Sequence, residues 1–122
     1  MDLTPYRDTN RLLLIFAPSR TDERYDRQRQ LLQGEDDGLA DRDLVLLQLL
    51  GDGKGFMQGN PVSPEEASGA REGFGVGDGE FAAVLVGKDG TEKLRSGEPV
   101  SAEELFGRID EMPMHRREME EG

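Results

Sequence analysis

The side chains that could do chemistry in this chain are hydroxyl, carboxylate and guanidinium groups, because it has no cysteine. Disulfide bonds, thiolate catalysis and cysteine-ligated zinc or iron-sulfur sites are therefore excluded together. The single histidine, His115, stands beside Arg116 and Arg117 in a polar stretch. One histidine without cysteine partners makes a poor metal site. We therefore predict no metal site, no catalytic residue set and no cofactor.

An anion site is the one small-ligand site that the sequence supports. Ser19, Arg20 and Thr21 follow an apolar strand-like run and precede a helical pattern. The free backbone N–H groups and the dipole at a helix N-terminus favour negative charge. The sequence thus predicts anion or small-ligand binding by these three residues, with an exposed, structural arginine as the simpler alternative.

The glycine-rich and acidic segments do not match the sequence patterns of known nucleotide-binding or calcium-binding loops. Segment 51–55 lacks the third glycine of a dinucleotide loop and the Gly-Lys-Ser/Thr ending of a phosphate loop, and 73–79 is typical of a helix end running into a strand. The acidic segments 35–37 and 118–121 lack the order of a calcium loop. We interpret them as loops and solvated charge.

The C-terminal tail combines charges of both signs. Arg116 and Arg117 could pair with carboxylates such as Asp110 or Glu118 and so clasp the end of the last helix. A docking surface for a partner protein is the alternative.

The length and net charge of the chain limit the number of domains it can form and the kinds of partner it can bind. The 122 residues predict a single domain, 1–122, with an N-terminal lead (1–10) and a polar C-terminal tail (113–122). The net charge of -11 argues against nucleic acid as a partner. No apolar run approaches the roughly 20 residues of a membrane span. As written, the chain is expected to be cytoplasmic; a mature exported domain whose signal peptide was removed is the alternative.

The basic residues are nearly all arginine on a strongly acidic chain, with lysine only at Lys54, Lys88 and Lys93. This pattern fits a halophilic or GC-rich source. Because salt screens repulsion among excess negative charges, we expect the melting temperature to rise from low to molar salt. A flat melting temperature over that range would contradict this expectation.

The first half of the chain predicts two parallel strands joined by a helix. Apolar runs at 12–17 and 44–50 are typical of strands buried on both faces. Between them, Thr21 or Ser19 is expected to cap a helix that ends at Gly34. An acidic turn follows it, at 35–38.

The second half predicts a helix, a hairpin and a last helix. Segment 51–62 is interpreted as a flexible loop, before Ser63 caps a helix that begins at Pro64. Asp89-Gly90 lies between two strand-like runs, which indicates a hairpin, and Ser101 begins the last capping box. The order β-α-β-α-β-β-α predicts an α/β domain with a mixed four-stranded sheet and helices on both faces.

This order resembles the thioredoxin fold. Loop 17–21 stands where thioredoxins and peroxiredoxins hold their reactive cysteine, and Glu80 stands where thioredoxins carry a cis-proline before a strand. Both catalytic features are absent, so the resemblance implies a thioredoxin-like fold without thiol chemistry.

A closer resemblance is to a thioredoxin-like family of unknown function called P-DUDES, found in bacteria and repeated in a secreted vertebrate protein linked to the extracellular matrix. Segments 11–18, 85–95 and 109–118 carry it. The resemblance implies a peroxiredoxin relative with no established activity, whose bacterial members commonly look exported.

Three functions remain open from the sequence. The first is a non-catalytic domain that binds another, unknown protein. The second is the anion or small-ligand site at Ser19, Arg20 and Thr21. The third is an enzyme whose hydroxyl and carboxylate groups converge only in the fold. The oligomeric state is undetermined.

Overall fold

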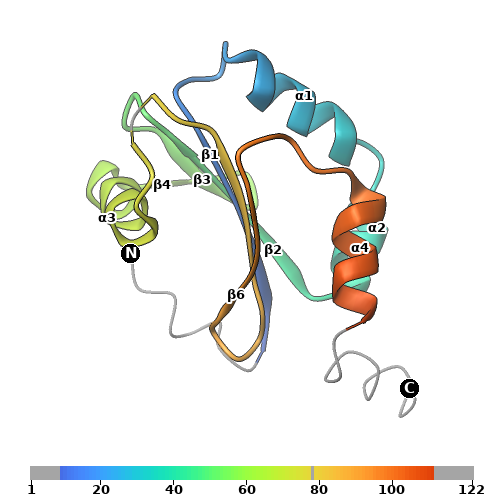
Figure 1. The fold of residues 1–122 in the computed structure, drawn as a ribbon. Helices are drawn as coiled ribbons and strands as arrows, with labels where there is room; N and C mark the ends of the chain where they lie inside the picture. The colour runs from blue at the N-terminus through green and yellow to red at the C-terminus, as the bar shows by residue number, and fades with distance from the viewer. Residues whose placement is uncertain (1–8, 78, 112–122) are drawn as a thin grey trace.

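The chain folds into a mixed sheet with helices on both of its faces, and the computed structural model describes residues 9–77 and 79–111 (Figure 1). The strands are β1 (Arg11–Ala17), β2 (Leu44–Leu50), β3 (Gly55–Met57), β4 (Asn60–Val62), β5 (Ala82–Val86) and β6 (Glu92–Ser96). The helices of the described part are α1 (Glu23–Leu32), α2 (Asp36–Asp41), α3 (Pro64–Phe74) and α4 (Ala102–Asp110).

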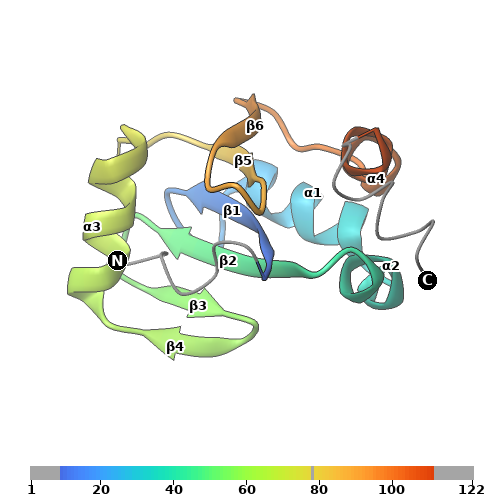
Figure 2. The same cartoon turned by 90° about the horizontal axis from the view of Figure 1, so that it is seen from below.

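The sheet has the strand order β4-β3-β2-β1-β5-β6. β1 and β2 are parallel, and the other neighbouring strands are antiparallel. Helices α1, α2 and α4 lie on one face and α3 lies on the other, as the two views show (Figures 1 and 2). All residues of β1 are buried because this strand is covered on both faces.

The seven predicted elements are present in the predicted order, with three further elements among them, but the prediction of four strands is wrong: the sheet has six. The two extra strands, β3 and β4, form a hairpin inside the segment that we interpreted as a loop. Its two turn residues, Gln58 and Gly59, have φ angles of 50° and 83°. Two adjacent residues with positive φ are typical of a tight hairpin turn, and the glycine-rich flank concealed that signal.

A short helix, α2, replaces the acidic turn predicted at 35–38. Its Gly38 lies against the ring of Phe106 in α4, where an added Cβ would come within 2.8 Å of the ring. The helix therefore needs glycine at this point for its contact with α4.

The two faces have separate cores. On the α1/α4 face, Leu13, Ile15 and Leu105 belong to one buried cluster. On the α3 face, Ala67 and Ala70 are buried, and their small side chains let α3 lie close to the sheet. The pocket described below opens on the first of these faces.

Candidate functional site

The loop after β1 holds the predicted hydroxyl residues in contact with each other. The Ser19 and Thr21 hydroxyl oxygens lie 2.9 Å apart, and the Thr21 N–H donates to Ser19 Oγ at 3.3 Å. Both side chains are thus used to shape the loop that leads into α1.

Asp22, not Thr21 or Ser19, caps α1. Its Oδ1 accepts the N–H groups of Arg24 and Tyr25 at 2.9 and 3.3 Å. The Arg24 guanidinium donates back to the same carboxylate at 3.2 and 3.0 Å and, with the N–H groups, lowers the pKa of Asp22. A carboxylate of the chain itself therefore occupies the amides that the sequence analysis assigned to an outside anion.

The Arg20 side chain contacts an aromatic ring of β3. Its guanidinium carbon lies 4.7 Å from the centre of the Phe56 ring, a cation–π contact with β3. Phe56 pairs with Gln48 of β2, so both side chains lie on the α1 face. This contact brings Arg20 next to a pocket that runs along α1.

The pocket has a volume of about 460 Å³ and lies between α1, α2 and the first two strands. That volume is within the range of small-molecule sites. Its lining residues are Ile15, Tyr25, Asp26, Gln28, Arg29, Gln30, Leu32, Gln33, Gly34, Asp36, Leu39, Leu46 and Gln48.

Two buried polar groups at the floor of the pocket are hydrogen-bonded. The Tyr25 hydroxyl donates to Gln48 Oε1. Gln28 is paired through both ends of its amide with the backbone of Val100, at 2.8 Å each. Because Tyr25 takes Oε1, the amide nitrogen of Gln48 is left as a donor.

Arg29 flanks the Tyr25–Gln48 pair and lies 5.9 Å from the centre of the Tyr25 ring. Burial raises the pKa of the Tyr25 phenol, while the positive charges of Arg29 and Arg20 act in the opposite direction. Within the described residues, neither arginine takes part in a hydrogen bond or an ion pair. Both guanidinium groups therefore have donors available beside the pocket.

Two carboxylates also line the pocket, from Asp26 and Asp36. Asp26 accepts a hydrogen bond of 2.9 Å from Gln30, one turn further along α1. Charges of both signs therefore border the pocket.

Of the predicted clasp at the end of the last helix, only Asp110 lies within the described residues. Asp110 forms a two-point contact with Arg42, at 3.2 and 3.1 Å, and Arg42 also stacks 4.0 Å from the Phe106 ring centre. These contacts join α2 to α4. The other members of the predicted clasp, Arg116, Arg117 and Glu118, lie outside the described residues, as does His115.

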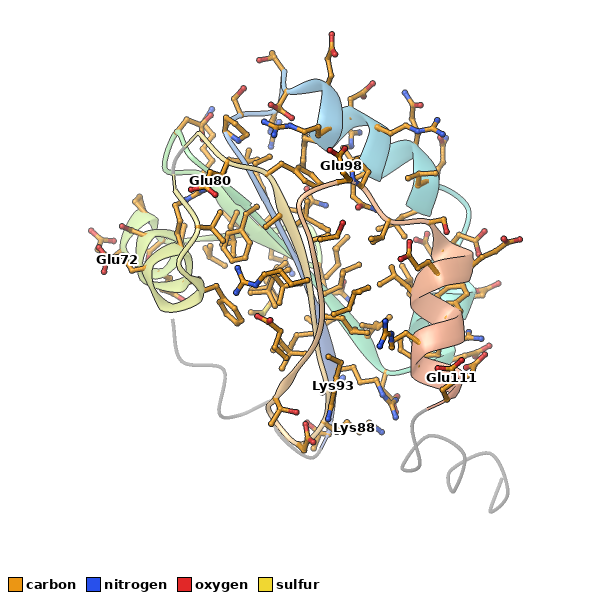
Figure 3. All side chains as sticks on the ribbon, viewed as in Figure 1. Glu72, Glu80, Lys88, Lys93, Glu98 and Glu111 are labelled. Carbon is orange, nitrogen blue, oxygen red and sulfur yellow. The ribbon has the colours of Figure 1, made fainter. Side chains whose placement is uncertain are left out.

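The cations at the opposite end of the sheet are paired. Figure 3 shows Lys88 and Lys93 near the β5–β6 hairpin, away from loop 18–22. Lys88 lies 2.8 Å from a carboxylate oxygen of Asp43, and Lys93 lies at the same distance from Asp89. Arg20 and Arg29 differ from these two lysines because neither has a carboxylate partner among the described residues.

In the parts of the chain that the structure describes, no group of three or more His, Cys, Asp or Glu side chains is placed to hold a metal ion. None of the described helices is long and apolar enough to cross a membrane.

Comparison with known proteins identifies a family. The family model "Domain of unknown function (DUF4174)" matches residues 2–118. The chain belongs to this family. Among curated proteins it is similar to the Sushi repeat-containing protein SRPX2 of Xenopus laevis, with 29% identity over 115 residues that cover 92% of this chain and 25% of that protein. The human protein of the same name is 28% identical over 120 residues, covering 96% and 26%.

The chain thus spans about a quarter of the length of the curated relatives it matches. Among solved structures, it is similar to a reduced 2-Cys peroxiredoxin of Plasmodium vivax, with a TM-score of 0.67 and 17% identity over 96% of this chain and 85% of the other. This likeness confirms the thioredoxin-like fold of this DUF4174 domain.

The sequence pattern pointed to Arg20, which does not itself line the pocket, and missed the residues of the DUF4174 domain that do. Tyr25 and Arg29 are separated by four positions on one helix, which places them on neighbouring turns. Gln48 is the one polar residue in the apolar run 44–50. That interruption was an available signal for a side chain with a polar partner, whereas the contact of Arg20 with Phe56 depends on a hairpin that was not predicted.

Proposed function

We propose that this DUF4174 domain is a non-catalytic binding domain and that its ligand places an anionic group in the pocket along α1. The observation that carries the proposal is that Arg20 stacks on the Phe56 ring and Arg29 on the Tyr25 ring, and neither has an acidic partner among the described residues. The chain has 26 acidic and 15 basic residues. Two guanidinium groups left without a carboxylate in such a chain are available to a ligand.

The absence of cysteine supports a function in binding rather than in thiol chemistry. By resemblance, loop 17–21 stands where thioredoxins and peroxiredoxins hold their reactive cysteine. Its hydroxyl groups, on Ser19 and Thr21, bond to each other, and within the described residues no basic side chain forms a hydrogen bond with either of them. An unactivated hydroxyl is a weak nucleophile, which disfavours an enzyme built on this loop.

The proposed site keeps Arg20 from the small-ligand hypothesis, but it places the ligand in a different position. Arg20 remains in the proposed site. Ser19 and Thr21 support it through the loop, and the ligand group is received beside Arg29 rather than at the capped amides of α1.

A thermal-shift series tests this proposal. Sulfate, phosphate, acetate, benzoate and glutathione are compared at equal ionic strength, with Arg20→Ala and Arg29→Gln beside the parent. An anion at ten times its dissociation constant adds about 1.4 kcal/mol of stability, or roughly 5 °C in melting temperature.

Arg27→Gln is the matched control, because Arg27 is an exposed arginine of α1 that does not line the pocket. We expect at least one anion to stabilise the parent and the control more than Arg29→Gln. Equal shifts in all four proteins would overturn the proposal.

A protein partner is the second candidate, with an acidic group of that partner as the anion. The curated relatives are about four times longer than the match, which is the arrangement expected of a domain that works beside other modules. We also infer that the DUF4174 family and the P-DUDES group are the same. Both are thioredoxin-like, both lack an assigned function, and both extend to a vertebrate protein.

Site-specific photo-cross-linking separates the two candidates. A cross-linking residue replaces Gln33, which lines the pocket, or the exposed Glu65 on α3 as a control. A protein captured from Gln33 but not from Glu65, and lost in Arg29→Gln, would favour the second candidate. Equal capture from both positions would count against it.

A further inference from the structure

We propose that the pocket selects a single carboxylate attached to an apolar body: a free medium-chain or aromatic acid, or the C-terminal carboxylate of a protein that ends in an apolar residue. This inference rests on the proposed anion-binding function and specifies the ligand.

The hydrogen-bond donors that line the pocket determine which head group the ligand carries. The Tyr25 hydroxyl bonds to Gln48 Oε1, and this contact orients the side-chain amide so that its N–H₂ group is the free end. The Arg29 guanidinium lines the same pocket. These are donors without acceptor capacity, and they complement the two oxygens of a carboxylate.

The charge of the ligand is limited by the acidic residues of the same pocket. Asp26 and Asp36 line it together with Arg29. A ligand with two negative charges would bring its second charge close to a carboxylate, and like-charge contacts disfavour such a ligand. One negative charge is therefore preferred over inorganic phosphate or a dicarboxylate.

The body of the ligand is assigned from the apolar part of the lining. Ile15, Leu32, Leu39 and Leu46 line the pocket, and Leu39 and Leu46 are only half-buried. Covering them removes apolar surface from water. Each methylene of a ligand buried in this way is expected to tighten binding about fourfold.

The test is a calorimetric titration of the parent with acetate, butyrate, hexanoate and octanoate, each at the same ionic strength. We expect the dissociation constant to fall about fourfold per methylene from butyrate to octanoate. Suberate, which has the length of octanoate and a second carboxylate, and inorganic phosphate should bind more weakly than octanoate. 1-Octanol should not compete with octanoate.

Variants connect the titration to the named side chains. Arg29→Gln should weaken octanoate binding about tenfold, whereas Arg27→Gln should leave it unchanged. Leu39→Gln should flatten the dependence on chain length while acetate binding stays as in the parent. Thermal denaturation of each variant confirms that it is folded.

A peptide arm separates the two sources of the carboxylate. N-acetyl-Gly-Gly-Leu-Leu is compared with its C-terminal amide. Tighter binding of the free acid than of the amide supports the same head-group chemistry from a protein source, and tighter binding of octanoate than of either peptide supports the free acid. Equal binding of acid and amide, together with no chain-length dependence, overturns the inference.

The failure of this inference is distinguishable from failure of the proposed function. If acetate and phosphate bind through Arg29 and longer acids bind no tighter, the anion site stands and the selection of an apolar monocarboxylate is wrong. If no anion binds the parent differently from Arg29→Gln, both are wrong.

Discussion

Arg71 and Arg29 show two uses of the same side chain on opposite faces of one sheet. Arg71, on α3, is only 6% exposed and donates to the carbonyl oxygens of Ala17, Leu49 and Gly77, at 3.3, 2.8 and 3.0 Å. Arg29, on α1, is exposed and stacks on the Tyr25 ring. Arg71 donates hydrogen bonds to backbone carbonyl groups of the chain, whereas the N–H donors of Arg29 are available to a ligand.

The difference follows from how each face is covered. On the α3 face, small residues such as Ala67 and Ala70 let the helix approach the strands, and Arg71 fills the remaining polar gap at the ends of β1 and β2. On the other face, the pocket separates part of α1 and α2 from the strands. A buried arginine needs acceptors from the protein, whereas an exposed arginine such as Arg29 does not.

The largest loss of unfolding free energy is expected for Arg71→Met. It removes donors from three carbonyl groups at the ends of two strands and a loop, so the free energy of unfolding should fall by about 3 kcal/mol. Urea denaturation measures this change, with Arg27→Met as the exposed control. A loss as small as that of the control would show that Arg71 does not brace the sheet.

A smaller effect is expected for Tyr25→Phe. The change removes the hydroxyl that bonds to Gln48 and should cost about 1 kcal/mol of unfolding free energy. It also frees the Gln48 amide to turn. Anion affinity, measured in the thermal-shift series, should therefore fall even though no charge is lost; unchanged affinity would mean that the hydroxyl does not orient the amide.

Acid should weaken both the cap of α1 and the turn between β5 and β6. The pKa of Asp22 is lowered from its ordinary value of 3.8, first by the Arg24 hydrogen bond, and that of Asp89 is lowered first by Lys93. Depressed carboxyl pKa values contribute stability above pH 3.8 that is lost as the pH falls below it. Urea midpoints taken from about pH 6 to about pH 2 should fall less steeply in Asp22→Asn than in the parent. Equal slopes would contradict the role of this carboxylate.

The smallest effect on stability is expected at the pocket arginines. Arg20→Ala and Arg29→Gln should each stay within about 0.5 kcal/mol of the parent in urea denaturation, because neither side chain satisfies a group of the chain. A loss comparable to that of Arg71→Met would make them structural and remove the contrast between the two faces.

The sequence predicted the elements whose signals are local. Apolar runs predicted β1 and β2, and the capping residues Ser63 and Ser101 predicted the starts of α3 and α4. Asp22 was missed as the cap of α1 because Ser19, Thr21 and Asp22 are all good capping residues, and their choice depends on the path of the loop.

The site was harder to predict than the fold. Its side chains come from α1 and β2 and, through Phe56, from a hairpin hidden in a glycine-rich segment. Arg20 was identified from the loop and assigned to the helix N-terminus. Its side chain stacks on the ring of Phe56, 36 positions further along the sequence, and no local pattern reports such a contact.

The most direct test of the α1 pocket is a heteronuclear NMR titration of the parent with octanoate, observing the side-chain amide of Gln48. The account predicts a saturable shift of that signal, accompanied by shifts at Leu46 and Arg29, while the hairpin around Gly90 stays unchanged. A titration in which the Gln48 amide does not move, or in which the hairpin signals move most, would contradict it.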